Sequence, residues 1–595
     1  MRRSWTLLCV GLLLIGVLGT ATACFGDDDS PDAVLSRFAN ALHDRTITHA
    51  ADLTDNPTAA RSALTSVFDG VGRKALLAVD ARIIDDKQVT GTLHYRWDFG
   101  GGRTTDYEST VLLVQQESGW RVSWAPTVLH PDLRAGQTFS FSEDRAYRTP
   151  VEDRHNLPLL TWQTVSVVSL SRDSIGSAQR LAQALRPIEP SMTGQGIRAL
   201  FDGNTTARQS VIRLRQTDMA RVGPQLRAIP GVSISEQGDL LSASRALRSP
   251  AMNGLEDIWR QTIDTTAGWS LSIVNPDGSA AQVISQTDPR TTSPIVTTLD
   301  RDIQTHAQEA VDSENKPTVI VALQPSTGGI LAVAQNAAAD TSGPIALSGL
   351  YPPGSTFKTI TTAAALEAGL VNPSTPLGCP GRATIQGRTI PNENDFDLGT
   401  VSLTSAFAHS CNTTMGALAN RLPATALTTT ARTFGIGADY DIPGITTVTG
   451  DVPNADTPAL RVENGIGQGK VTVSPFGLAV AEVSLAQGKT VTPQLVRGRR
   501  TTGDTGEERI PPNVVADLRE MMRATVTDGT ATALRDIAGL GGKTGTAEYG
   551  DNRNPHGWFA GIVGDLAFAT LVVGGGSSDP AVNVSGEFLR PLRTR

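Results

Sequence analysis

The segment Tyr351-Pro352-Pro353-Gly354-Ser355-Thr356-Phe357-Lys358 decides the fold class and the chemistry of this 595-residue chain. Two prolines and a glycine predict a turn, and Ser355 follows where a helix can begin. Residues 359–370 are apolar and rich in alanine, which predicts a buried helix. Positions three apart share a helix face, so the Ser355 hydroxyl and the Lys358 amine can meet. The pattern favours a serine activated by a neutral amine, because burial and the helix N-terminus both lower a lysine pKa.

The spacing S-x-x-K is weak evidence by itself, because the chain contains a second copy. Ser313 and Lys316 have the same spacing, but they stand in a polar stretch before a strand-like run at 318–323. No helix is predicted there to present the serine, so we interpret Ser313 as a solvated loop residue. The case for Ser355 therefore depends on other segments.

Two further segments carry side chains that suit the same site. Ser410-Cys411-Asn412 offers a hydroxyl that can relay a proton and an amide that can donate to and accept from a peptide. Gly542-Lys543-Thr544-Gly545-Thr546 is predicted as a strand on which the two threonines share one face. Two hydroxyls and a nearby cation suit a substrate carboxylate, and Gly545 would let a ligand backbone approach the strand.

A nucleotide-binding P-loop is the rival interpretation of Gly542-Lys543-Thr544. That motif requires a glycine five residues before Gly542, and the chain has Ile537 there. The chain also begins with an expected export signal, described below, and an exported protein has no supply of ATP. We therefore exclude this interpretation.

The order S-x-x-K, S-x-N, K-T-G resembles that of the penicillin-recognising serine enzymes, and the chain resembles the penicillin-binding proteins from about residue 296 to its end. The segment Arg148 to Arg154 resembles the opening of the pedestal of class B enzymes, although Thr149 and Asn156 stand where glycines are expected. The preceding domain resembles the MecA-type N-terminal domain. Further segments that resemble the family are 323–332, 467–469, 474–475, 529–531 and 558–561.

The resemblance implies a mechanism for a peptidoglycan D,D-transpeptidase. Neutral Lys358 would take the proton of Ser355, which attacks the penultimate D-alanine carbonyl of a stem peptide. The backbone N–H groups of Ser355 and Thr546 would form the oxyanion hole, and Ser410 would pass a proton to the leaving D-alanine. The implied substrate-binding residues are Asn412, Lys543, Thr544, Gly545 and Thr546. β-Lactams would acylate Ser355 because they mimic the D-Ala-D-Ala end.

A multidomain α+β architecture is predicted. We expect a signal segment at 1–23, a small cone-like MecA-type domain at 24–147, a pedestal or dimerisation domain at 148–295 and the transpeptidase domain at 296–595. In the last, an antiparallel sheet assembled from both ends would have helices on its faces. Its predicted strands are 318–323, 330–334, 541–547, 558–563 and 567–573.

The first two dozen residues are typical of an export signal. Arg2 and Arg3 precede an apolar stretch at 5–18, which is short for a membrane span. Small residues then precede Cys24, which resembles a bacterial lipobox and implies lipidation at Cys24 on the outer face of the cell membrane. The alternatives are an ordinary signal peptide and an uncleaved anchor, and all three place the body outside the cytoplasm.

Composition limits the remaining choices. The net charge is −8 and the basic residues are scattered, so we expect no nucleic-acid partner. No ligand-spaced cluster of histidine and cysteine occurs, so we expect no metal and no cofactor. Outside the cytoplasm Cys379 and Cys411 are candidates for a disulfide, with two buried free thiols as the alternative.

Three functions remain open. The first is a D,D-transpeptidase that works with stem peptides, β-lactams, a lipid anchor and cell-wall synthesis or division proteins as partners. The second is a carboxypeptidase or β-lactamase on the same fold, which passes the acyl group to water. The third is a non-catalytic scaffold or β-lactam sensor.

Overall fold

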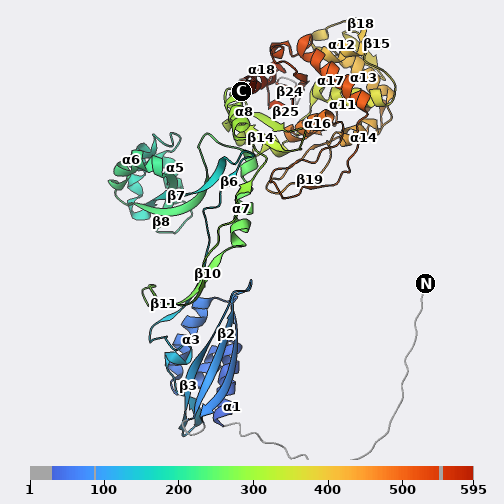
Figure 1. The fold of residues 1–595 in the computed structure, drawn as a ribbon. Coiled ribbons are helices and arrows are strands. Elements are labelled where there is room, and N and C mark those ends of the chain that lie inside the picture. The colour runs from blue at the N-terminus through green and yellow to red at the C-terminus, as the bar shows by residue number, and fades with distance from the viewer. Residues whose placement is uncertain (1–29, 86–88, 549–553, 594–595) are drawn as a thin grey trace, which may run out of the picture. The chain divides into compact units, whose positions relative to one another are not determined.

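The computed structural model describes residues 30–85, 89–548 and 554–593, so the expected signal segment and Cys24 lie outside the described residues. Packing divides the chain into two compact units. The first unit combines the N-terminal residues to Arg145 with Ala267–Arg290, and the second combines Ala146–Thr266 with Thr291–Arg595 (Figure 1). Both mix helices and strands, which confirms the predicted α+β class.

Three helices and a four-stranded antiparallel sheet make up most of the first unit. Ser30 caps the first helix through the backbone N–H of Ala33, and Asn56 caps the third through that of Ala59. The strands follow the order β1-β2-β3-β4. The bounds are α1 Pro31–His43, α2 Ile47–Asp52, α3 Pro57–Val71, β1 Leu76–Asp85, β2 Thr90–Asp98, β3 Thr104–Gln116, β4 Gly119–Val122 and η1 Pro126–Val128.

The first unit is completed by a segment from much later in the chain. Strand β5 (Thr138–Asp144) pairs with β10 (Gly268–Val274), which pairs with β11 (Ala280–Thr287). Trp269, Leu271 and the next alternate residue of β10 are buried in the core of this unit. The expected domain 148–295 is therefore not one packing unit, because pairing with β5 draws residues 267–290 out of it.

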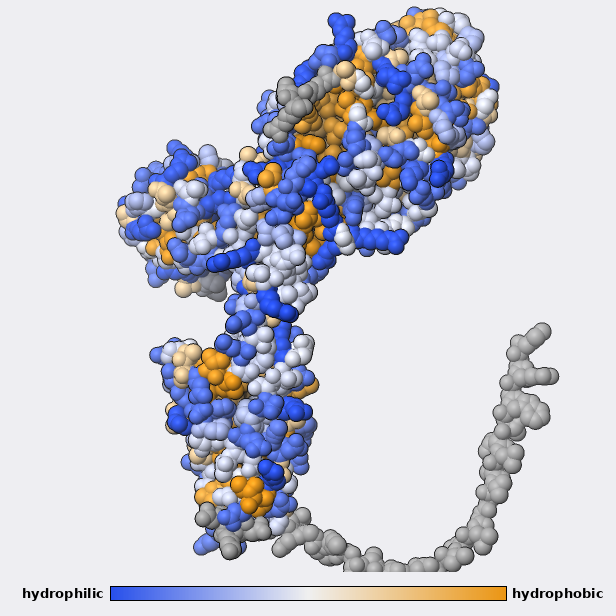
Figure 2. Space-filling view, in the orientation of Figure 1, coloured by the Kyte–Doolittle hydropathy of each residue, from blue (hydrophilic) through white to orange (hydrophobic). Residues whose placement is uncertain are grey.

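The visible surface of the first unit is mostly hydrophilic, with small separate apolar areas (Figure 2). Its exposed large apolar side chains include Leu76 and Leu112. Across the described residues, no helix combines the length and apolar character needed to cross a bilayer.

Residues 146–266 form a sheet with helices packed on it. The order is β12-β6-β7-β8, and β9 pairs with β7 from Leu160 to Leu170. The bounds are β6 Val151–Glu152, β7 Pro158–Ser171, η2 Arg172–Ser177, α4 Ala178–Leu185, α5 Gly194–Ala199, β8 Arg208–Arg215, α6 Gln216–Arg227, β9 Val232–Ser242, η3 Pro250–Met252, α7 Leu255–Asp264 and β12 Ile295–Val296.

A five-stranded antiparallel sheet forms the centre of the remaining chain, in the order β14-β13-β25-β24-β23. Its strands come from both ends of this region, which confirms the predicted assembly. The bounds are β13 Thr318–Leu323, β14 Ile330–Gln335, β23 Gly541–Ala547, β24 His556–Val563 and β25 Leu566–Val572.

Strand alternation divides the apolar side chains of this sheet between two cores. In β13, Ile320 and Ala322 pack with α8 (Arg301–Asp312) and α18 (Asp579–Leu589) on one face. Val319, Val321 and Leu323 belong to the larger core, which contains α16 (Pro475–Gln487) and α11 (Lys358–Glu367). The buried helix predicted after Ser355 is α11. Its first residue, Lys358, is itself fully buried.

The other helices and short hairpins surround this sheet and the cleft described below. The helices are α9 Ala337–Asp340, α10 Ile345–Ser348, η4 Gly354–Phe357, η5 Glu393–Asp395, α12 Leu403–Ala408, α13 Asn412–Arg421, α14 Ala426–Thr433, α15 Pro458–Gly465, α17 Pro512–Thr527, η6 Thr532–Leu534 and η7 Pro591–Arg593. The paired short strands are β15 Pro376–Cys379 with β18 Gly399–Ser402, β16 Arg382–Ile385 with β17 Arg388–Pro391, β19 Tyr440–Asp441 with β22 Thr502–Gly503, and β20 Gly450–Asp451 with β21 Thr472–Val473.

Candidate active site

The backbone of the turn before Ser355 is held by hydrogen bonds on two sides. The indole Nε1 of Trp558 donates to the Pro352 carbonyl at 3.0 Å, and the Gly354 N–H donates to the Gly467 carbonyl at 3.0 Å. Gly354 has φ +52, and a Cβ there would stand 2.5 Å from the Thr546 carbonyl oxygen. Glycine is required at this position, and the close approach brings Ser355 beside β23.

Lys358 is the first residue of α11, and its side chain is fully buried. Its Nζ lies 2.7 Å from the Ser410 carbonyl oxygen, 2.6 Å from Asn412 Oδ1 and 3.2 Å from Ser410 Oγ. The first two oxygens can only accept. A neutral amine supplies one N–H to each and keeps its lone pair for a hydroxyl proton.

Burial and a second cation hold the amine of Lys358 in that form. Desolvation lowers its pKa well below the ordinary range, and the charge of Lys543 lowers it further, while Glu393 acts in the opposite direction. Burial also lowers the pKa of Lys543 to about 7, again opposed by Glu393. Both effects favour the neutral form of Lys358, and Lys543 changes its protonation state near neutral pH.

Ser410 connects the two lysines. Its Oγ lies 3.2 Å from Lys358 Nζ and 3.0 Å from Lys543 Nζ. Its backbone is in the left-handed region at φ +63, which is uncommon for a residue other than glycine. That conformation turns the Ser410 carbonyl toward Lys358, so the strained backbone and the hydroxyl both serve the same amine.

Strand β23 brings Lys543 and Thr544 to the site from the edge of the sheet. Lys543 is fully buried, and the hydroxyl of Thr544 lies 2.5 Å from that of Thr530. A Cβ on Gly545 would stand 2.8 Å from the Pro353 carbonyl oxygen and 3.1 Å from the Thr356 nitrogen. On the side toward which a Cβ would point, the turn before Ser355 fills the space, so glycine at this position allows β23 to pack against that turn.

The side chains meet in a cleft of about 640 Å³. Ser355 lies in its wall, and its hydroxyl has no hydrogen-bond partner among the described residues, whereas the two lysines lie beneath the surface. The lining residues predicted from sequence are Ser355, Ser410, Asn412, Thr544 and Thr546. Sequence reasoning missed other lining residues, among them Arg388, Asn392, Glu393 and Glu463. These residues belong to no recognisable motif, and only the fold brings them to the cleft.

A disulfide joins the S-x-N segment to a neighbouring strand. Cys411 is the middle residue of that segment, and it is bonded to Cys379 at the end of β15, with the two Cα atoms 6.0 Å apart. Both cysteines are fully buried. Over the described stretches of the chain, no group of histidine, cysteine, aspartate and glutamate could hold a metal ion.

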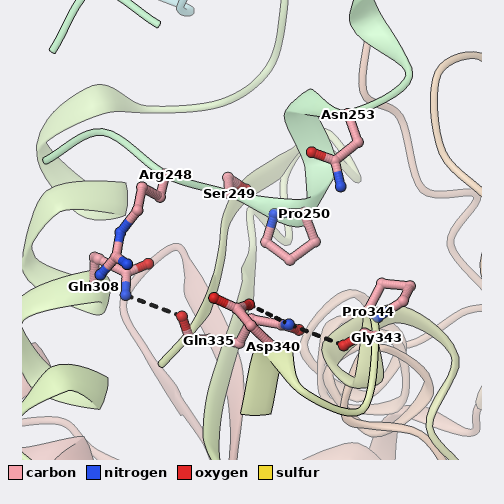
Figure 3. A pocket seen from close by; sticks show the side chains of 9 residues that line it. All are labelled: Arg248, Ser249, Pro250, Asn253, Gln308, Gln335, Asp340, Gly343 and Pro344. Atoms are coloured by element: carbon pink, nitrogen blue, oxygen red, sulfur yellow. Dashed lines mark hydrogen bonds between the residues drawn. The ribbon is translucent and has the colours of Figure 1, made fainter. Parts of the chain in front are cut away.

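A second cavity of about 290 Å³ lies away from these residues (Figure 3). Gln308 Nε2 donates to the Gln335 carbonyl at 3.0 Å, and Gln335 Nε2 donates to Asp340 at 2.6 Å and to the Gly343 carbonyl at 2.9 Å. The wall of this cavity is thus tied together by its own amides. None of the predicted site residues lines it.

An antiparallel sheet whose edge strand carries K-T-G, beside a helix that opens with S-x-x-K, is typical of the penicillin-recognising serine enzymes. Two family models match the chain. Residues 318–592 match the penicillin-binding protein transpeptidase domain, and residues 30–137 match the NTF2-like N-terminal transpeptidase domain, MecA_N. The chain therefore carries both of these domains and is homologous to the class B penicillin-binding proteins, which confirms the predicted resemblance.

Named relatives agree with this assignment. The chain is 33% identical to the peptidoglycan D,D-transpeptidase PbpA of Mycobacterium tuberculosis over 286 residues, which are 40% of this chain and 57% of the relative. It is 35% identical to PbpA of Mycolicibacterium smegmatis over 43% of this chain and 62% of the relative. Penicillin-binding protein 3 of Bacillus subtilis is 20% identical over 93% of each chain. The match thus spans about three fifths of the length of the PbpA relatives.

Proposed function

We propose that the protein is a peptidoglycan D,D-transpeptidase that works through an acyl-Ser355 intermediate. The observation that carries the proposal is the chain of contacts Lys358–Ser410–Lys543 beneath the Ser355 wall of the cleft. It supplies an amine, Lys358, that we assign as the base for Ser355, and a hydroxyl, Ser410, that can relay a proton. The relatives named PbpA support the same reaction class.

In the first half of the reaction, the lone pair of Lys358 takes the Ser355 proton as Oγ attacks the penultimate D-alanine carbonyl of the donor stem. The tetrahedral oxyanion sits between the N–H groups of Ser355 and Thr546. The C–N bond then breaks, and the proton passes from Lys358 through Ser410 to the leaving D-alanine amine. Lys358 is neutral again, and the acyl group remains on Ser355.

In the second half, the amine of a neighbouring stem attacks the ester carbonyl. Its proton returns through Lys358 to Ser355 Oγ, which leaves as the new peptide bond forms. Asn412 would hold the donor peptide, and Thr544, Thr546 and the Lys543 charge would hold its terminal carboxylate. Gly545 contributes through the approach of β23 to the turn. A β-lactam would acylate Ser355 by the first half alone.

The proposed setting is the outer face of the bacterial cell membrane, with Cys24 lipidated. Cell-wall synthesis or division proteins are the proposed partners. The exported character of residues 1–23 supports the setting. Metabolic labelling with a fatty acid, lost in Cys24→Ala, tests the anchor, and an unlabelled wild-type protein would contradict it.

A hydrolytic function is the second candidate, because it would need a carboxylate to activate water, and Glu463 lines the cleft. In the sequence this residue stands between the S-x-N and K-T-G motifs. Its carboxylate is held by Arg388, with Nε 2.8 Å from Oε1. This ion pair ties the carboxylate to the protein, so we place transfer to an amine before hydrolysis.

Incubation of the whole chain with a reporter penicillin separates these functions. The transpeptidase proposal expects a stable adduct that is absent in Ser355→Ala. Rapid turnover that slows in Glu463→Gln would support the hydrolase, and the absence of any adduct would support a non-catalytic scaffold. A stem-peptide donor with an amine acceptor then distinguishes cross-linking from carboxypeptidation.

A further inference from the structure

We propose that Asn392 is a positioning residue of the site, which caps helix α13 from outside and thereby fixes the S-x-N segment on the two lysines. The inference rests on the proposed function, since the segment it positions holds the proton relay. Asn392 lies in the cleft wall between β17 and η5 and is 2% exposed. Nothing in its sequence surroundings distinguishes it.

The oxygen of the Asn392 side-chain amide accepts hydrogen bonds from the start of helix α13. Helix α13 begins directly after Cys411, whose own side chain caps no backbone N–H. Asn392 Oδ1 accepts instead from the N–H of Asn412 at 2.8 Å and from that of Thr413 at 3.2 Å. These are two of the N–H groups that a helix leaves unpaired at its start. The cap comes from 20 residues upstream, so the Cys411 side chain is available for the disulfide.

The nitrogen of the same side-chain amide donates hydrogen bonds to the segments on either side of β16 and β17. Asn392 Nδ2 donates to the carbonyls of Pro380 and Phe396, each at 2.9 Å, and lies 3.4 Å from Cys379 Sγ. The amide therefore uses both its donor and its acceptor capacity inside the protein. It joins the segment that contains β16 and β17 to the start of α13. Its partners are backbone groups and the buried sulfur of Cys379.

The consequence concerns the orientation of the neighbouring Asn412 amide. Asn412 Oδ1 accepts from Lys358 Nζ at 2.6 Å, and one of its two amide protons goes to the Pro391 carbonyl at 2.8 Å. Pro391 is adjacent to Asn392, so the same amide fixes both ends of that contact. The second Asn412 amide proton is then left for a peptide carbonyl, and Ser410 is held against Lys358.

The test measures the second-order acylation rate of the whole chain with a reporter penicillin. Asn392→Ala removes both the acceptor and the donor contacts of this amide. We expect the acylation rate to fall by about tenfold to a hundredfold, the usual cost of a misplacement near 1 Å. Asn392→Asp keeps the acceptor for α13 and loses the donors, so an intermediate rate is expected. The matched control is Asn372→Ala, which removes an exposed amide that accepts from Ser374.

A double-mutant cycle separates positioning from general destabilisation. If Asn392 acts through the relay, adding Asn392→Ala to Ser410→Ala should slow acylation by less than about threefold. Full additivity, or a wild-type rate in either Asn392 variant, overturns the proposal. If Asn392→Ala does not fold, the Asp variant decides alone. A wild-type chain that is never acylated sinks the proposed function, whereas a labelled wild type with unaffected variants sinks only this inference.

Discussion

In the proposed mechanism Lys543 acts as a cation although its side chain is fully buried, and this conflict determines how we expect the site to respond to pH. Burial lowers the pKa of Lys543 to about 7, so the amine is charged below that pH and neutral above it. Lys358, whose pKa burial and Lys543 lower strongly, has to be neutral to accept the Ser355 proton. The proposed mechanism therefore needs the two lysines in opposite protonation states, so acylation depends on pH through both of them.

The first prediction is an alkaline limb in the acylation profile of the wild-type protein. As the pH rises through about 7, Lys543 loses its charge and the carboxylate of a penicillin loses its partner, so the acylation rate constant should fall. In Lys543→Arg this limb should disappear, because a guanidinium stays protonated. Rates measured on both sides of that pH test this, and an identical limb in both proteins would contradict it.

The second prediction concerns Glu482, a fully buried carboxyl in α16. Burial raises its pKa from 4.5 to about 8, so the folded protein binds a proton there that the unfolded chain releases. The contribution to stability is thus present at low pH and is lost as the pH rises from about 4.5 through 8. Glu482→Gln should raise the free energy of unfolding by on the order of 4 kcal/mol at about pH 8 and by much less at about pH 5.

Denaturant unfolding of both proteins at the two pH values measures this difference. The matched control is Glu309→Gln, which changes an exposed carboxyl on α8. We expect this control to alter the free energy of unfolding little at either pH. An equal effect of Glu482→Gln at both pH values would show that the carboxyl is not the titrating group.

At the scale of elements, the site depends on how closely strand β23 approaches the turn at η4. Gly545→Ala places a methyl group 2.8 Å from the Pro353 carbonyl oxygen, so the strand and the turn must separate. We expect acylation to slow by about tenfold or more, because the N–H of Thr546 moves away from Ser355. Gly506→Ala is the control, since a Cβ there meets nothing within 4 Å.

Thermal unfolding of the two glycine variants accompanies the rate measurement. If Gly545→Ala acylates as fast as the wild type, the close approach of β23 is not needed for the oxyanion hole. A slow rate with a melting temperature near that of Gly506→Ala supports a local effect on the site.

Much of the site could be predicted because its residues stand in short motifs with a local spacing. Ser355 lies in η4 and Lys358 begins α11 directly after it, whereas Lys543 and Thr544 share β23, so each motif falls within one short continuous stretch of structure. Asn392 could not be found in this way, because its partners are backbone groups of distant segments and any polar loop offers an asparagine. The same limit applies to β10, whose alternation predicts a strand but not the strand it pairs with.

At the scale of the whole molecule, the first unit is formed by two stretches of chain with 121 residues between them, from Ala146 to Thr266. Such an insertion is tolerated where the two ends of the interrupted domain lie close together. Here Asp144 at the end of β5 stands opposite Gly268 at the start of β10 in the antiparallel register. The expected boundary at 147 treats the domain as one continuous stretch of chain. The pairing of β5 with β10 instead adds residues 267–290 to the first unit.

The last prediction is that the first unit folds alone only when both stretches are present. A chain of residues 30–145 joined to 267–290 by an Asn-Gly turn would close β5 and β10 as a hairpin, because their ends are already opposite each other. Residues 30–145 alone leave the core side of β5 uncovered where Trp269 and Leu271 pack. We expect cooperative thermal unfolding of the joined chain by circular dichroism and a lower or absent transition for the shorter one. Equal midpoints would show that β10 and β11 only cover a unit that is stable without them.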